Sequence, residues 1–132
     1  MADETVFVDC DNTLILYPYE EAYWAIYGNP YDKVASGEWA GIPDEPEPNV
    51  PLIEAIDLYA GPRVSFVVWS GGGKWYALRW AEKYMPTRAF GWRAAAKDRA
   101  MVGPGDIVVD DQEFKSRGRW MTPAQFVGMV NG

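Results

Sequence analysis

The pattern of apolar and polar residues along the chain predicts strands that alternate with helices. Continuous apolar runs at residues 5–8, 63–69 and 107–109 are typical of strands buried on both faces of a sheet, and residues 87–90 form a weaker candidate strand. We expect helices at residues 50–59, from the glycine triplet at 71–73 to about residue 84, at residues 94–101, and from residue 122 to about residue 130.

This alternation predicts an α/β fold. Such a chain forms a mostly parallel sheet with right-handed crossovers and helices on both faces, here a Rossmann-like three-layer sandwich. The length of 132 residues suits a single domain, residues 1–132, with one core. Asn49 is placed to cap the helix at 50–59, and residues 122–125 match a capping box with proline in the first turn.

Residues 16–47 interrupt the pattern directly after the first strand. The segment is rich in tyrosine, tryptophan, glycine, proline and acidic residues and has no sustained period of either kind. We interpret it as an insertion or flap, with a short helix near residues 20–27. Its aromatic side chains fit either a small cap that stacks on a base or sugar, or packing against the domain or another subunit, and we favour packing.

Composition and charge narrow the possible functions. The net charge of −7 repels a nucleic-acid backbone, so we expect no long duplex as a partner. No secretory signal and no apolar run long enough for a membrane span are present, and the single cysteine, Cys10, has no partner for a disulfide. We therefore expect a cytoplasmic protein without a membrane partner, and we expect Cys10 to be buried. The absence of histidine excludes His-based triads and most zinc sites.

Acidic and hydroxyl residues follow three of the predicted strands. Asp9 and Asp11 come after the first strand, Ser70 ends the second, and Asp110 and Asp111 follow the strand at 107–109. The carboxyl ends of parallel strands meet at one edge of the sheet, where ligands bind in open α/β folds. Crowded carboxylates need a cation, and Mg²⁺ prefers carboxylate oxygens together with water and phosphate.

A lysine and a glycine-rich turn complete the predicted centre. Lys97 can bring a positive charge to the same edge. The backbone N–H groups of Gly71 and Gly72, at the start of a helix, favour bound phosphate. Together these features indicate a phosphoryl-transfer site for a phosphorylated substrate.

The order of these pieces resembles the haloacid dehalogenase-like (HAD) superfamily of phosphohydrolases. The run from Asp9 to Leu14, Asp-Cys-Asp-Asn-Thr-Leu after an apolar strand, looks like the first motif of that family. Ser70 matches the second motif, Lys97 is the best candidate for the third, and the acidic pair at 110–111 matches the fourth. The resemblance covers nearly the whole chain except residues 16–47 and implies a HAD-like fold with a small cap.

The resemblance also implies a role for each residue. Asp9 would be the nucleophile that forms an aspartyl-phosphate, and Asp11 the general acid/base. Mg²⁺ would be held by the Asp9 side chain, the Asp11 backbone carbonyl and Asp110, with Asp111 as a further ligand or close to one. The groups expected to contact the phosphoryl group are Thr13, Ser70, Gly71, Gly72 and Lys97.

Three departures from the family pattern leave alternatives open. Cys10 fills the variable position, Asn12 stands where glycine is common, and the interval from Lys97 to Asp110 is short, so Lys74 is the substitute for the third motif. An aspartate at position 11 is typical of the phosphatases of the family and argues against carbon–halogen cleavage.

The sequence therefore predicts a Mg²⁺-dependent phosphomonoester hydrolase. A small phosphorylated substrate is expected, with a nucleotide or a terminal phosphate as the leading choice and sugar phosphates or phosphoproteins as others. The alternative is a non-catalytic phospho-acceptor or partner-binding module on the same type of fold. A receiver domain would carry its acceptor aspartate after the third strand, whereas the acids here follow the first and the fourth. The oligomeric state is not predicted.

Overall fold

A computed structural model describes residues 3–16 and 46–132 of the chain, and its centre is a five-stranded sheet. The strand order is β5-β4-β1-β6-β7, and all four pairings between neighbours are parallel. The mostly parallel α/β sheet predicted from the sequence is thus confirmed. The strands are β1 (Glu4–Asp9), β4 (Val64–Ser70), β5 (Arg93–Ala96), β6 (Ile107–Val109) and β7 (Arg119–Met121).

Three α-helices pack against the sheet, and each begins at a residue that suits a helix start. The helices are α3 (Val50–Tyr59), α4 (Lys74–Tyr84) and α5 (Pro123–Asn131). The side chain of Asn49 accepts a hydrogen bond from the backbone N–H of Leu52, and Thr122 with Gln125 forms the predicted capping box. The glycine turn before α4 ends at Gly73, whose φ of 107° lies in the region that favours glycine.

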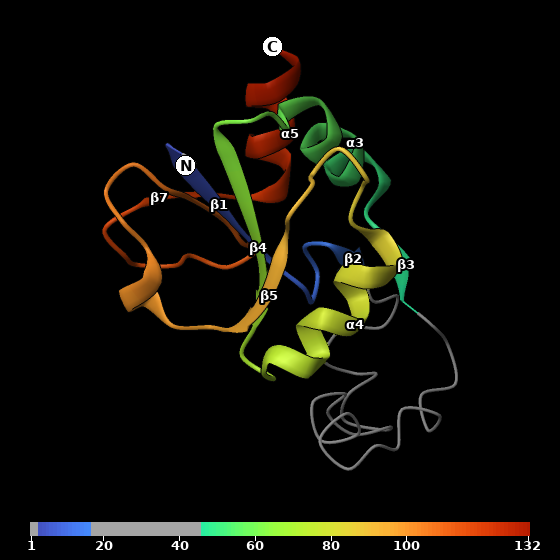
Figure 1. Cartoon of the computed structure of the whole chain (residues 1–132), viewed down its shortest axis with the longest axis horizontal. Helices are drawn as coiled ribbons and strands as arrows, with labels where there is room; N and C mark the ends of the chain where they lie inside the picture. The colour runs from blue at the N-terminus through green and yellow to red at the C-terminus, as the bar shows by residue number, and fades with distance from the viewer. Residues whose placement is uncertain (1–2, 17–45) are drawn as a thin grey trace.

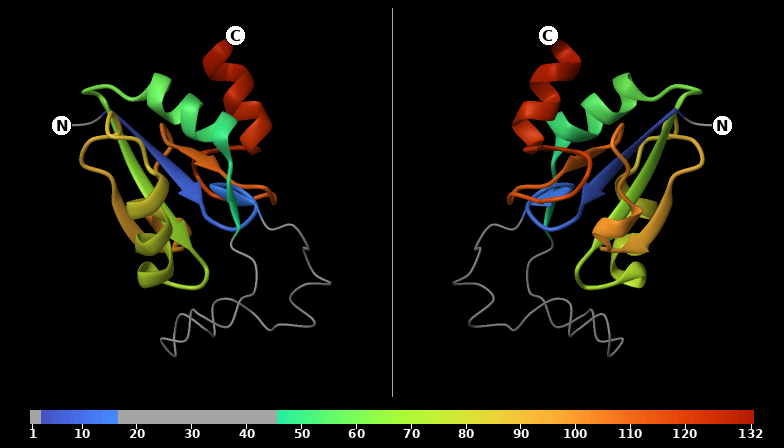
Figure 2. Two further views of the ribbon diagram at one scale, coloured as in Figure 1. Left: turned by 90° about the vertical axis from the view of Figure 1, so that its right-hand side faces the viewer. Right: turned by 90° about the vertical axis from the view of Figure 1, so that its left-hand side faces the viewer.

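The two faces of the sheet are covered differently. All three helices lie on one face, where their apolar side chains share a core with alternate residues of the strands, such as Val6, Val8 and Val68 (Figures 1 and 2). On the other face, Val102 and Phe114 come from loops and cover a smaller cluster. Within the described residues this face carries only the 3₁₀ helix η2 (Arg99–Met101). The predicted helical third layer is therefore wrong for this part of the chain.

The outer strands account for the other differences from the sequence-based prediction. Residues 87–90 form turns, and the segment predicted as a helix at 94–101 instead supplies β5 and η2. Alanine-rich residues 94–96 favour a helix in isolation, but pairing with β4 in the sheet outweighs that preference. The short strand β7 was not predicted, and the backbone N–H of Asp110 donates to the Met121 carbonyl there (3.0 Å).

The insertion predicted at residues 16–47 begins and ends in a short antiparallel ribbon. Strand β2 (Ile15–Leu16) pairs with β3 (Glu47–Pro48), so the two ends of the predicted insertion lie side by side. The predicted short helix near 20–27 and the aromatic side chains of the flap lie outside the described residues. Among the described helices, none has the length and apolar character needed to cross a membrane.

Candidate active site at the carboxyl edge of the sheet

Buried polar side chains of the described residues all gather at one edge of the sheet. They follow the carboxyl ends of the neighbouring strands β1, β4 and β6, as the sequence predicted. The set is Asp9, Asp11, Thr13, Ser70 and Asp110, each at most 6% exposed. Removing polar groups from water costs free energy unless they find partners, so a concentration of this kind indicates a site rather than a core.

Lys97 lies between two of the buried carboxylates. Its Nζ is 2.9 Å from Asp9 Oδ1 and 2.7 Å from Asp110 Oδ2. Its backbone N–H donates to the Ser70 carbonyl (3.0 Å), which continues the β4–β5 pairing and carries the lysine to this edge. In the described part of the chain, the ammonium of Lys74 lies over the Trp75 ring instead, so Lys97 is the lysine that contacts the carboxylates.

Three carboxylates at this edge are close enough to share a cation. One oxygen each of Asp9, Asp110 and Asp111 lies within 4.8 Å of the others. Burial, followed by repulsion from Asp110, raises the pKa of Asp9 to about 8, although Lys97 opposes this change. Burial and the neighbouring Asp110 raise the pKa of Asp111 to about 6. A donor set made of carboxylate oxygens suits a hard divalent cation, which would favour the ionised forms.

The side chain of Lys97 remains protonated at this site. Burial acts to lower the pKa of this ammonium, but the carboxylates of Asp9 and Asp110 more than compensate, so its pKa is raised. The lysine is therefore cationic at neutral pH, and it already offsets part of the negative charge before any metal binds.

A tight loop after β1 presents the first aspartates. The N–H of Leu14 donates to the Asp9 carbonyl (3.2 Å), and Asn12 has a φ of 56° in the left-handed region. Asparagine adopts this conformation more readily than most residues, which explains how it replaces the glycine common in the family pattern. The departure at position 12 is thus compatible with the same turn.

Thr13 links this loop to the loop after β6. Its hydroxyl lies 3.2 Å from Asp9 Oδ2 and 3.5 Å from Asp111 Oδ1, and it accepts a hydrogen bond from the Asp111 backbone N–H (3.1 Å). The hydroxyl has one proton, so it donates to one carboxylate at a time. The threonine therefore positions two of the acidic side chains relative to each other.

Asp11 is held by a tyrosine that the sequence analysis did not place at the site. The Tyr76 hydroxyl of α4 donates to Asp11 Oδ1, while the ring is fully buried and packs edge-on against Trp80 at a centroid distance of 6.4 Å. A tyrosine at a fully buried position usually has a partner for its hydroxyl, but spacing alone does not identify that partner.

Ser70 and the glycine turn form a compact unit at the end of β4. Ser70 Oγ accepts a hydrogen bond from the Gly72 N–H (3.0 Å), and the Ser70 carbonyl accepts one from the Gly73 N–H (3.1 Å). The Ser70 hydroxyl keeps its own proton for donation to another acceptor. The N–H of Gly72 is used within the turn, and the contact of Gly71 and Gly72 with phosphate stays a prediction.

Comparison with known proteins adds no relative. The chain matches no protein-family model, no curated protein and no solved structure. Any assignment of function therefore rests on the geometry of the site and on the motif order, and the resemblance to the HAD superfamily stays a prediction.

Proposed function

We propose that this protein is a Mg²⁺-dependent phosphomonoester hydrolase that acts through an aspartyl-phosphate on Asp9. The observation that carries the proposal is the gathering of every buried polar side chain of the described residues around a lysine and a three-carboxylate cluster. A HAD-like phosphatase would need a nucleophile, a cation site, a proton donor and phosphate contacts at one sheet edge, and the motif order supplies candidates for each.

The chemistry can be assigned to atoms of this chain. A carboxylate oxygen of Asp9 attacks phosphorus, the bond to the ester oxygen breaks, and Asp11 gives its proton to the departing oxygen. Asp11 then takes a proton from water as the water attacks the phosphoryl group, which releases inorganic phosphate and restores Asp9. Mg²⁺ held by Asp9, Asp110 and Asp111, and by the Asp11 carbonyl as the resemblance implies, would neutralise charge on the phosphoryl oxygens.

The remaining residues orient these groups. Ser70 donates its hydroxyl proton to a phosphoryl oxygen, and Lys97 balances the charge of Asp9 and of the phosphoryl group. Tyr76 is a positioning residue, because its hydrogen bond to one oxygen of Asp11 fixes the plane of the carboxyl group that transfers the proton.

The charge of the protein narrows the proposed substrate class. We propose a small phosphorylated molecule, with a nucleotide or a terminal phosphate first among the choices, and a cytoplasmic location. A net charge of −7 weighs against a long nucleic-acid duplex.

The experiment that tests the proposal is a phosphate-release assay. We would use a chromogenic aryl phosphate and a panel of nucleotides and sugar phosphates, each with Mg²⁺ and with a chelator. Asp9→Asn should retain less than a few per cent of the wild-type rate, because an amide neither attacks phosphorus nor binds the cation well. Asp57→Asn is the matched control, since Asp57 lies on α3 in an exposed ion pair with Arg88.

Two results would overturn the proposal. Metal-independent release, or substantial release by Asp9→Asn, would remove Asp9 and the cation from the mechanism. Binding of Mg²⁺ without release from any compound would favour the alternative, a phospho-acceptor or partner-binding module.

A further inference from the structure

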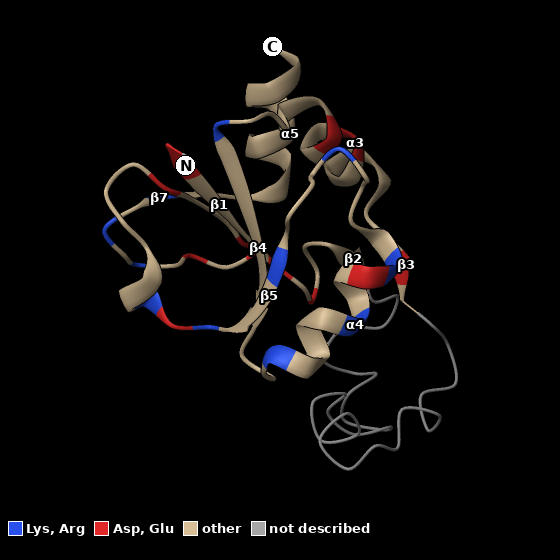
Figure 3. Ribbon diagram, viewed as in Figure 1, with Lys and Arg blue, Asp and Glu red and all other residues tan. Residues whose placement is uncertain are grey.

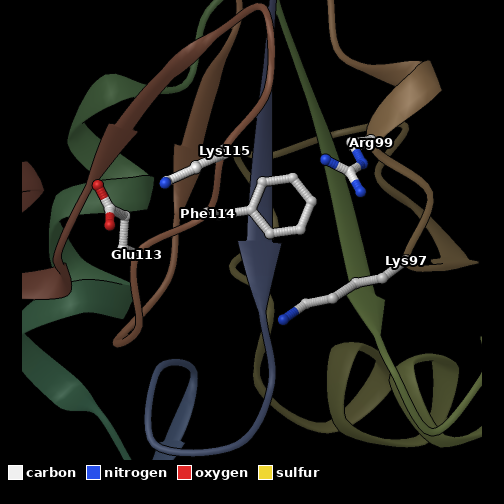
Figure 4. Close-up of a pocket in the computed structure, with 5 residues that line it drawn as sticks. All are labelled: Lys97, Arg99, Glu113, Phe114 and Lys115. Carbon is white, nitrogen blue, oxygen red and sulfur yellow. The ribbon is translucent and has the colours of Figure 1, made fainter.

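A pocket lies next to the carboxylate cluster, on the sheet face that the loops cover. Its volume is about 420 Å³, and its wall comes from the segments after β5 and β6. Figure 4 shows the ring of Phe114 near its centre, with two basic side chains on one side and an acidic and a basic one on the other. The lining residues are Lys97, Arg99, Glu113, Phe114 and Lys115.

The pocket is basic although the protein is acidic. Lys97 is paired with Asp9 and Asp110, which leaves Arg99 and Lys115 against the one carboxylate of Glu113 in the wall, whereas the whole chain has a net charge of −7. Arg99 and Lys115 are exposed, and within the described residues neither has an ion-pair partner. Figure 3 shows both basic and acidic residues along the loops on this side of the sheet.

Two acidic residues close to these loops, Asp98 and Asp106, bind backbone groups and form no ion pair with Arg99 or Lys115 among the described residues. Asp98 accepts a hydrogen bond from the Ala100 N–H (3.0 Å), which caps η2. Asp106 accepts bonds from the backbone N–H groups of Thr5 (2.9 Å) and Gly103 (2.8 Å). These carboxylates therefore stabilise loops, and Glu113 is the single acid of the pocket wall.

Lys97 connects this pocket with the carboxylate cluster. Its ammonium contacts Asp9 and Asp110, as described above, and lies 5.7 Å from the centre of the Phe114 ring. The same ring packs at 5.3 Å from Trp69 in the sheet, so the apolar wall is anchored in the core. Lys97 is therefore shared by the wall of this pocket and the carboxylate cluster.

We propose that this pocket binds a second phosphate group of the substrate through Arg99 and Lys115. A guanidinium group binds phosphate oxygens in pairs, and a nearby ammonium adds charge without strict geometry. The inference rests on the proposed function and narrows it: the substrate is a phosphomonoester with a further phosphate, carried either on a nucleoside or on a sugar.

The first arm of the test measures binding without catalysis. With a chelator present, the carboxylates at the sheet edge repel anions, so inorganic phosphate titrated into the full chain by calorimetry reports on the pocket. We expect the double variant Arg99→Gln/Lys115→Gln to bind phosphate at least about tenfold more weakly than the wild type, as for lost charge-assisted hydrogen bonds. Arg63→Gln/Arg88→Gln removes the same charge at the opposite end of the sheet and should bind as the wild type does.

The second arm measures selectivity with Mg²⁺. Adenosine 5′-monophosphate is compared with adenosine 3′,5′-bisphosphate, and fructose 6-phosphate with fructose 1,6-bisphosphate, so that each pair differs by one phosphate. We expect kcat/KM to be about tenfold higher for the bisphosphate than for the monophosphate in one of the two pairs, and that pair identifies the scaffold. The ratio of the two kcat/KM values should fall toward one in Arg99→Gln/Lys115→Gln and stay unchanged in the control variant. Circular dichroism of each variant checks that the fold is intact.

The two arms separate the pocket from the proposed function. Equal phosphate binding by the wild type and Arg99→Gln/Lys115→Gln would contradict the proposal that the pocket binds a second phosphate. An unchanged kcat/KM ratio in that variant would contradict it as well. Absence of turnover for all four compounds, with phosphate binding that depends on Arg99 and Lys115, would overturn the hydrolase and leave the anion site in place.

Discussion

The two ends of the central sheet place their charged groups in opposite ways. At the carboxyl end, Asp9 and Asp110 are buried and share one lysine. At the amino end, Asp3 pairs with Arg63 directly before β1 and β4, and both side chains are more than half exposed. The same chemical groups are thus desolvated at one end and solvated at the other.

This difference in burial gives the charged groups at the two ends of the sheet different effects on the stability of the protein. An exposed ion pair contributes little free energy because water and salt screen it. Buried carboxylates lose their hydration and repel one another, which raises the pKa of Asp9 to about 8. A fold keeps such a cluster at a cost in stability, so the carboxyl end is where ligand binding would recover free energy.

The largest expected effect is on proton transfer at the carboxyl end. Asp11→Asn should slow the chemical step by about 10²–10⁴-fold for an alkyl phosphate, the usual range for loss of a general acid/base. Single-turnover kinetics with Mg²⁺ checks this. A wild-type rate in the variant would assign the proton transfer to another group.

Removal of the shared cation should destabilise the carboxyl end. Lys97→Met leaves Asp9 and Asp110 without their counter-charge and should cost about 3 kcal/mol in the free energy of unfolding at pH 8 without metal. Urea denaturation measures this loss, and Mg²⁺ should recover part of it. Unchanged stability of the variant would show that the lysine does not hold the carboxylates together.

The cluster also predicts how the metal-free protein responds to pH. The pKa of Asp9 is about 8 in the folded protein and 3.8 in the unfolded chain, and that of Asp111 is about 6 against 3.8. The folded state therefore binds more protons, so stability is highest below pH 4 for these groups and is lost as the pH rises to about 8. Thermal unfolding at pH 5 and pH 8 with a chelator should show a Tm lower by several degrees at pH 8.

A control variant and a metal titration sharpen that prediction. Asp9→Asn has no titrating group at this position and should show a smaller change of Tm between the two pH values, and saturating Mg²⁺ should also reduce it. A Tm that rises with pH in the metal-free wild type would contradict the raised pKa of Asp9.

A smaller effect is expected where α4 supports Asp11. Tyr76→Phe removes one hydroxyl and should lower kcat about tenfold for an alkyl phosphate, whose leaving oxygen needs a proton, with less than a twofold change for a dinitrophenyl phosphate. Loss of a buried hydrogen bond should also cost about 1 kcal/mol in stability. An equal loss of rate for both esters would indicate a general disturbance of the site instead of a disturbed proton transfer.

The smallest effect is expected at the amino end. Arg63→Ala breaks the exposed pair with Asp3 and should change the free energy of unfolding by less than about 0.5 kcal/mol, with normal turnover. Denaturant titration at low and high salt measures the effect. A loss of unfolding free energy as large as that of Lys97→Met would show that charged pairs at the two ends of the sheet contribute equally to stability.

The central elements could be predicted from the sequence, and the outer ones could not. Continuous apolar runs identify β1, β4 and β6 because buried parallel strands need apolar residues on both faces. Strand β7 has only three residues, and β5 is rich in alanine, so neither carries a local signal strong enough to compete with helix or loop. Their conformation depends on pairing with a neighbour that is distant in the sequence.

The candidate site, like the fold, has parts that could be predicted from the sequence and parts that could not. The positions of Asp9, Ser70 and Asp110 at one edge follow from topology alone, since each ends or follows a parallel strand. The choice of Lys97 over Lys74, and the bond from Tyr76 to Asp11, depend on side chains that meet from different elements. Spacing along one helix or strand carries no information about such contacts.

The ribbon formed by β2 and β3 brings together two positions that are distant in the sequence. Leu16 and Glu47 are paired, so the two attachment points are adjacent whatever the length of chain between them. In general, each doubling of the length of a flexible connection between two such points costs only about 0.6 kcal/mol of closure entropy. For protein engineering, the paired residues Leu16 and Glu47 are two adjacent attachment points, and a module attached at Leu16 would begin close to Asp111, because both residues line the same pocket.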